Sequence, residues 1–117
     1  MRRFAALALL PLALIGAKDD PLAGRVAGTP VDCIDLDTAQ GPDIVDSKTI
    51  LYRESGKRIW KVSPTDACPS LRPMSTMIVD VFGGRLCRND RFRTVETGMS
   101  IPSASCRFGQ FTPYDTP

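Results

Sequence analysis

Short apolar runs separated by turn residues recur along the chain after residue 17, and this pattern predicts β-strands. The clearest pair is a hairpin in which residues 49–53 and 58–62 flank a turn that contains Gly56. Four further strands are predicted at residues 31–36, 76–82, 91–95 and 107–112. No ten-residue stretch in this part shows the 3.6-residue period of an amphipathic helix. The pattern predicts an all-β fold, a small antiparallel barrel or sandwich.

Turn residues interrupt these runs at regular places. Residues 40–43, Gln-Gly-Pro-Asp, predict a turn, and residues 46–49, Asp-Ser-Lys-Thr, predict a second turn that leads into the hairpin. Residues 63–73 contain three prolines and are expected to be irregular, because proline cannot serve a central ladder. The pair Gly83-Gly84 predicts the turn after residues 76–82.

The first 17 residues have a different pattern from the rest of the chain. Arg2 and Arg3 precede an unbroken apolar stretch that ends at Ala17, which is typical of a secretory signal peptide. The stretch is shorter than the roughly 20 apolar residues that span a bilayer, and a buried helix would show a polar face. We expect cleavage after Ala17 and no transmembrane segment in the mature chain. Residues 18–30 are expected to form a flexible or loosely docked N-terminal arm, followed by one domain at 31–117.

Composition narrows the classes of function. The 117 residues suffice for one small domain, and the formal charge is +2. Without the predicted signal peptide 13 basic residues face 13 acidic ones, so the basic character belongs to the leader and does not indicate nucleic acid as a partner. The chain has no histidine, which removes the commonest general base and the commonest zinc ligand.

Four cysteines are the strongest structural signal in the sequence. None forms a C-x-x-C pair, so we expect disulfides in an oxidising compartment, the periplasm or the exterior, and no zinc. Four cysteines allow three connectivities, and the sequence does not choose among them. We prefer Cys68–Cys87, which closes a local loop, with Cys33–Cys106, which ties the ends of the domain together. The predicted domain is therefore stapled by two disulfides.

A cluster of acidic residues could supply oxygen ligands to Ca²⁺. Its members are Asp32, Asp35, Asp37, Asp43 and Asp46. The spacing does not match an EF-hand loop, and aspartate is a common turn former. We expect turn and surface roles here, and neither a metal nor a cofactor site.

The predicted hairpin carries a candidate binding face of aromatic and cationic residues. These are Tyr52, Arg53, Arg58, Trp60 and Lys61, a combination that suits a polysaccharide or a single-stranded nucleic acid. Strand alternation argues against a single face, because Tyr52 shares its side with Ile50, whereas Lys61 shares its side with Ile59. The alternative is a half-exposed hairpin with Trp60 in the core.

A run of arginines follows in the second half of the chain, at Arg85, Arg88, Arg91 and Arg93. Clustered arginines recognise phosphate and carboxylate groups. The alternative, which we favour from the sequence, is a solvated edge strand whose charges prevent pairing between sheets.

The serines could supply a nucleophile, but nothing in their spacing selects one. They are Ser63, Ser70, Ser75, Ser100, Ser103 and Ser105. No histidine can activate them and no G-x-S-x-G motif is present, so only a pairing with Lys48, Lys57 or Lys61 is conceivable. We predict no catalytic residues.

Four segments carry a resemblance to a known group of proteins. They are Asp46-Ser47-Lys48-Thr49-Ile50-Leu51, Cys68-Pro69-Ser70-Leu71, Arg85-Leu86-Cys87 with Asp90, and residues 106–113. In these segments the chain resembles a family of short exported bacterial proteins with a signal peptide, four cysteines and no established activity. The resemblance implies a secreted, disulfide-bearing β domain and carries no functional residues.

The sequence therefore favours an exported, non-enzymatic binding module of the bacterial envelope, whose partner is an envelope protein or a polysaccharide. A small hydrolase or inhibitor-like protein and a purely structural component are the alternatives. An enzyme should show a concave site with an activated group. A binding module should show an exposed apolar or aromatic patch.

Overall fold

The computed structural model describes residues 20–117. The predicted signal peptide, residues 1–17, and the first two residues of the predicted arm lie outside them. Every regular element in the described part is a β-strand, so the prediction of an all-β fold is confirmed. The strands are β1 (Val26–Ala27), β2 (Cys33–Asp35), β3 (Ala39–Asp46), β4 (Thr49–Glu54), β5 (Arg58–Pro64), β6 (Thr76–Val79), β7 (Arg85–Cys87), β8 (Arg91–Val95) and β9 (Cys106–Asp115).

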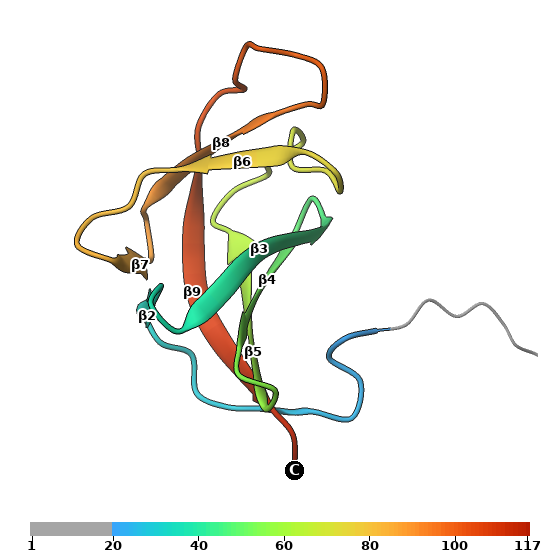
Figure 1. The fold of residues 1–117 in the computed structure, drawn as a ribbon, viewed down its shortest axis with the longest axis vertical. Helices are drawn as coiled ribbons and strands as arrows, with labels where there is room; N and C mark the ends of the chain where they lie inside the picture. The colour runs from blue at the N-terminus through green and yellow to red at the C-terminus, as the bar shows by residue number, and fades with distance from the viewer. Residues whose placement is uncertain (1–19) are drawn as a thin grey trace, which may run out of the picture.

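Seven strands form one strongly curved antiparallel sheet that nearly closes into a barrel (Figure 1). The order is β3-β4-β5-β9-β8-β6, and the short β1 adds to the C-terminal end of β9. Strands β3 and β6 are the two edges that a closed barrel would join. The second sheet, β2 with β7, is held beside β9 by main-chain bonds such as Asn89 N–H to the Phe108 carbonyl, 2.8 Å. The long β9 is therefore the central strand of the fold.

The predicted hairpin is present as β4 and β5, with Tyr52 opposite Trp60. The turn before it also forms as predicted, because Asp46 Oδ1 accepts the Lys48 N–H at 2.8 Å. The predicted turn at residues 40–43 is wrong. The chain continues through it as β3, and a register shift between Gln40 and Asp43 absorbs the irregular residues.

The core lies inside the curved sheet and is dominated by three phenylalanines. Phe92, Phe108 and Phe111 are almost completely buried, and the rings of Phe92 and Phe108 lie 4.6 Å apart. Burying each such side chain contributes about 1.5–3 kcal/mol. The register of β5 against β9 shifts between Val62 and Pro64. Gly109 faces this shift, and a Cβ there would lie 2.8 Å from the Ser63 carbonyl oxygen.

Two disulfides staple the domain as predicted, but the preferred pairing is wrong. The bonds are Cys33–Cys87 and Cys68–Cys106. Cys33 and Cys87 are cross-strand partners in the small sheet. Cys68 follows the end of β5, and β5 runs beside β9 with Pro64 opposite Phe108, so the chain returns to the start of β9 at Cys106. In the chain-entropy model each bridge contributes about 4 kcal/mol.

The N-terminal arm is docked on the barrel over its described residues. Strand β1 pairs with β9, and the Gly28 N–H donates to the Pro113 carbonyl at 2.7 Å. Arg25 also donates to the Lys57 carbonyl at 2.9 Å. Pairing therefore begins at Val26, earlier in the chain than the predicted domain start at residue 31.

Candidate binding surface

The predicted aromatic and cationic face of the hairpin is not assembled. Tyr52 and Trp60 point into the core, where only 2% and 7% of their surfaces are exposed. Burial raises the pKa of the Tyr52 hydroxyl well above its usual value. Arg53 and Lys61 lie on the opposite side of the sheet, where Lys61 Nζ is 6.0 Å from the Tyr114 ring centre. The alternative interpretation, with Trp60 in the core, is the one that the structure supports.

Arg58 is on the Trp60 side, but its charge is already satisfied. Its guanidinium lies 5.1 Å from the centre of the Trp60 ring and donates to both carboxylate oxygens of Asp115 at 2.7 and 2.8 Å. These bonds raise the pKa of Arg58 and lower that of Asp115. The Trp60 indole N–H donates to Glu54 Oε1 at 2.6 Å. At this end of the barrel, Arg58 and Trp60 are therefore each bonded to a carboxylate of the same chain.

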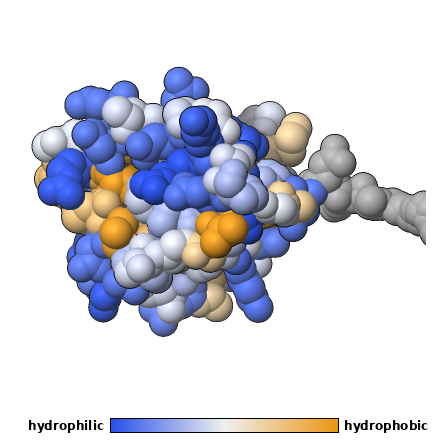
Figure 2. Space-filling view, turned by 90° about the horizontal axis from the view of Figure 1, so that it is seen from below, coloured by the Kyte–Doolittle hydropathy of each residue, from blue (hydrophilic) through white to orange (hydrophobic). Residues whose placement is uncertain are grey.

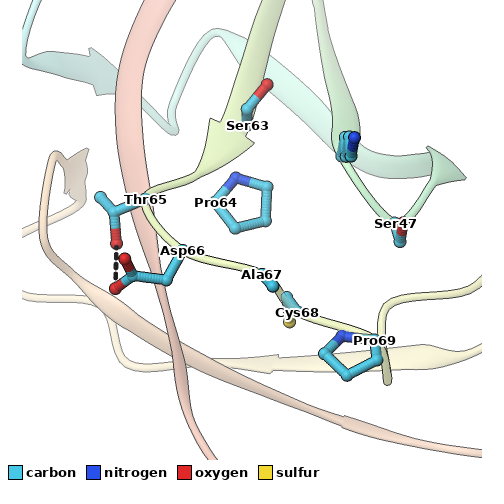
Figure 3. A pocket seen from close by; sticks show the side chains of 9 residues that line it. Ser47, Ser63, Pro64, Thr65, Asp66, Ala67, Cys68 and Pro69 are labelled. Carbon is cyan, nitrogen blue, oxygen red and sulfur yellow. Dashed lines mark hydrogen bonds between the residues drawn. The ribbon is translucent and has the colours of Figure 1, made fainter.

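A hollow of about 470 Å³ lies between the β3–β4 turn and the segment after β5 (Figure 3). Its walls come from Ser47 and Lys48 on one side and from residues 63–69 on the other. Thr65 and Asp66 turn toward each other on the far side from Ser47 (Figure 3), and their side-chain oxygens lie 3.5 Å apart. Among residues 20–117, no hydrogen bond joins Lys48 to a serine hydroxyl, so the serine–lysine pairing considered from the sequence is not formed in this hollow.

The acidic cluster is dispersed into turns and ion pairs. Asp35 Oδ1 accepts the Asp37 N–H at 3.0 Å, and Asp43 pairs with Arg53 at 3.2 Å. In the described part of the chain, no group of three acidic or cysteine side chains is placed to hold a metal ion. The turn and surface roles expected for these residues are those observed.

The arginine run separates into two groups. Arg85 and Arg88 belong to the small sheet and its turn, where Arg88 is 3.7 Å from Asp32. Arg91 and Arg93 lie on β8, which is flanked by β9 and β6, so the edge-strand explanation is wrong for these two residues. Protection of an edge therefore does not explain why Arg91 and Arg93 are charged.

Arg91, Arg93 and Arg107 form a surface that we call the arginine face. Arg91 and Arg93 share the outer side of β8 because strand side chains alternate, and Arg107 of β9 is directly opposite Arg91. All three are exposed. Like charges directly opposite each other destabilise a sheet. Over residues 20–117, none of the three lies within ion-pair distance of a carboxylate.

Three carboxylates are close in the fold without forming an ion pair with this face. Asp80 donates its main-chain N–H to the Arg91 carbonyl at 3.0 Å, and Asp80 and Asp90 line a small hollow with Arg91. Asp66 lines a polar hollow of about 370 Å³ with Arg107. Arg93 is opposite Ile78, two residues along β8 from Arg91, and lines neither of these hollows.

Strand β6, beside this face, has one unpaired side that we call the open edge. The Asp80-to-Arg91 bond fixes the phase of the β6–β8 ladder, so Thr76 and Ile78 bond to β8. The N–H and C=O groups of Met77 and Val79 therefore point away from β8. Within residues 20–117 no strand pairs with that side.

Most of the exposed large apolar side chains of the described residues lie on β6 or in the loops near it. Six of the nine large exposed ones in the described chain belong to β6 or its neighbouring loops: Met74, Ile78, Val81, Phe82, Met99 and Ile101. The 96–101 loop is joined to residues 72–74 by the Arg72–Glu96 ion pair, 3.1 Å, and by the Thr97 hydroxyl donating to the Met74 carbonyl, 3.2 Å. The face seen from below, by contrast, is mostly hydrophilic with scattered apolar residues (Figure 2).

A groove of about 510 Å³ separates the start of β6 from β3, where the barrel fails to close. Ile44 and Met77, from its two walls, are partly buried and pack against the core. Met74, on its rim, is 87% exposed with a positive φ of 74°. That backbone conformation costs a non-glycine residue on the order of 1 kcal/mol, and the bond from the Thr97 hydroxyl to the Met74 carbonyl helps to hold the main chain in it.

Comparison with known proteins does not assign this surface. No family model matches the chain. No curated protein and no solved structure shows detectable similarity to it. The resemblance to a family of short exported bacterial proteins therefore stays a prediction. Within residues 20–117 no helix has the length and apolar character needed to cross a membrane.

Proposed function

We propose that this protein is an exported binding module of the bacterial envelope that recognises an anionic partner through the arginine face. The observation that carries the proposal is the arrangement of Arg91, Arg93 and Arg107 on two interior strands with no ion-pair partner. A folded sheet carries the cost of this like-charge arrangement, and an external anion would offset it.

Three further features support binding to another molecule. The two disulfides are compatible with an oxidising compartment, in which an exported protein meets its partners. The exposed apolar side chains around β6 are the kind of patch that marks an interaction site. Guanidinium groups bind carboxylate, phosphate and sulfate in the same two-pronged manner, so all three chemistries belong to the proposal.

The test is titration of the oxidised protein with two probes, poly-L-glutamate for carboxylates and heparin for sulfates. Binding is followed by the NMR signals of the arginine side chains. We expect shifts at Arg91, Arg93 and Arg107 that weaken with added salt. Arg93→Gln and Arg107→Gln should each lower affinity about threefold to fivefold, the effect of about 0.6–1 kcal/mol.

Arg85→Gln is the matched control, because Arg85 of β7 is exposed and, like the arginines of the face, forms no ion pair with the carboxylates of residues 20–117. It should leave affinity unchanged within about twofold. Binding of neither probe, or an equal loss with Arg85→Gln, would show that the arginine face is not a binding surface.

A further inference from the structure

We propose that the anionic partner is a protein segment that docks as an extra β-strand on the open edge of β6. The segment is extended, with acidic side chains alternating with apolar ones. This inference rests on the proposed function, since it specifies the kind of anion that the arginine face recognises. It is carried by three features of the described residues: free main-chain groups, an apolar groove and charge on one side.

The free main-chain groups are those of Met77 and Val79. Their N–H and C=O groups point away from β8, at the spacing of alternate strand residues. An extended peptide satisfies such groups by pairing with them, and main-chain hydrogen bonds then supply much of the affinity. The edge has no proline, no bulge and no charged residue between Thr76 and Val79, so nothing on it opposes a new strand.

The groove determines which residue types suit the inner side of the incoming strand. It runs between β6 and β3, and partly buried Met77 and Ile44 contribute to its walls. Every second side chain of an added strand would point to this side and continue the core. These side chains should therefore be apolar.

The outer side chains would join the face that carries Ile78 and the arginines. Arg93 is opposite Ile78, and the added strand would lie two strand spacings from β8, roughly 10 Å. An extended arginine and a glutamate together cover that distance. The acid on the other wall of the groove, Asp43, already pairs with Arg53 at 3.2 Å. Glutamate or aspartate is thus the residue that this side favours.

Charge also distinguishes this occupant from a second copy of the chain. Two copies that paired through β6 would form one continuous sheet, with both arginine faces on it. Each copy would bring Arg91, Arg93 and Arg107, which form no ion pair with the carboxylates of residues 20–117. An acidic partner removes this repulsion, whereas a second copy doubles it.

The experiment uses a fluorescent seven-residue peptide of alternating valine and glutamate with the oxidised full-length domain. Anisotropy measures affinity, and amide hydrogen exchange by NMR reports on Met77 and Val79. We expect the peptide to bind and to slow exchange at these two amides. Arg93→Gln should weaken binding about threefold to fivefold.

Two control peptides match the probe in length. Alternating valine and lysine should bind about tenfold more weakly or not at all, because the arginine face repels it. The valine–glutamate peptide N-methylated at every second residue, made in both registers, keeps its side chains and loses one row of donors. In at least one register the affinity should fall about tenfold, since each lost main-chain bond is worth up to about tenfold.

The outcomes separate this inference from the function it rests on. Binding that depends on Arg93 but leaves Met77 and Val79 unprotected would overturn strand addition and leave anion binding standing. So would heparin binding without peptide binding, which would point to a polysaccharide. Protection of both amides at high protein concentration without peptide would identify a second copy as the occupant and overturn the inference. Binding of no anionic probe would overturn both proposals.

Discussion

The two edges of the same sheet, β3 and β6, are built in opposite ways. Strand β3 contains Pro42, which has no N–H to offer, and two register shifts that disrupt its outline. It also carries Asp43 and Asp46. Strand β6 reads Thr76-Met77-Ile78-Val79, regular and uncharged along its whole length. Proline, bulges and charges are the devices by which proteins prevent edge strands from pairing.

This difference indicates that the exposure of β6 is specific to that edge. A small barrel that left both edges unprotected would be prone to pair with other chains at either one. This chain blocks one edge and leaves the other open beside exposed apolar residues such as Met74 and Phe82, 87% and 73% exposed. The open edge is also the one next to the arginine face. The comparison predicts that changes to the two edges have unequal consequences.

The largest expected effect tests whether the core beneath β6 is packed as tightly as the core beneath the hairpin that pairs with β3. Phe92 on β8 is opposite Val79 of β6, and Trp60 packs on the inner side of the β4–β5 hairpin. Phe92→Ala and Trp60→Ala should each lower the free energy of unfolding by about 3–5 kcal/mol. Chemical denaturation with the disulfides intact measures both. A loss below about 1 kcal/mol for Phe92→Ala would mean that β6 borders a loosely packed region, and its edge would then not be a formed binding surface.

The next effect removes the protection of β3. Pro42→Val together with Asp43→Val gives this edge an apolar, β-branched character like that of β6. We expect new self-association, seen by analytical ultracentrifugation. Loss of the exposed Asp43–Arg53 ion pair should itself lower the unfolding free energy by less than about 1 kcal/mol. The control is Val81→Thr, an exposed position next to β6, which leaves the β3 edge unchanged. If the β3 variant stays monomeric, the two edges differ for a reason other than these residues.

Much of this contrast could be predicted from the sequence, because it depends on local pattern. The hairpin at β4 and β5, the turn at Asp46 and the limits of β8 follow from alternation and turn residues. The burial of Trp60 was one of two interpretations. Its alternation with Arg58 and Val62 could not decide between them, because Arg58 lies over the ring and shares its face.

What could not be predicted depends on which strands become neighbours. The arginine face needs Arg107, which lies opposite Arg91 only because β8 pairs with β9. The same pairing moves Arg91 and Arg93 from a supposed edge to an interior strand. The disulfides follow the same rule, since Cys68 reaches Cys106 through the β5–β9 pairing. Long-range pairing leaves no mark in a single sequence.

The smallest effect on stability gives the sharpest comparison of the two edges. Ile78→Lys and Val45→Lys each place one positive charge on an exposed apolar position, at 38% and 43% exposure, on β6 and β3 respectively. Both should change the unfolding free energy by no more than about 0.5 kcal/mol, as surface substitutions do.

The effects of these two substitutions on peptide binding should differ. The glutamates of a strand added to β6 would lie beside residue 78, so Ile78→Lys should tighten binding of the valine–glutamate peptide through a cross-strand charge pair. Val45→Lys should leave that binding unchanged. If charge attraction alone held the peptide, both variants would bind it more tightly. Anisotropy therefore separates strand addition from simple attraction by whether the change is confined to residue 78 or is shared by residue 45.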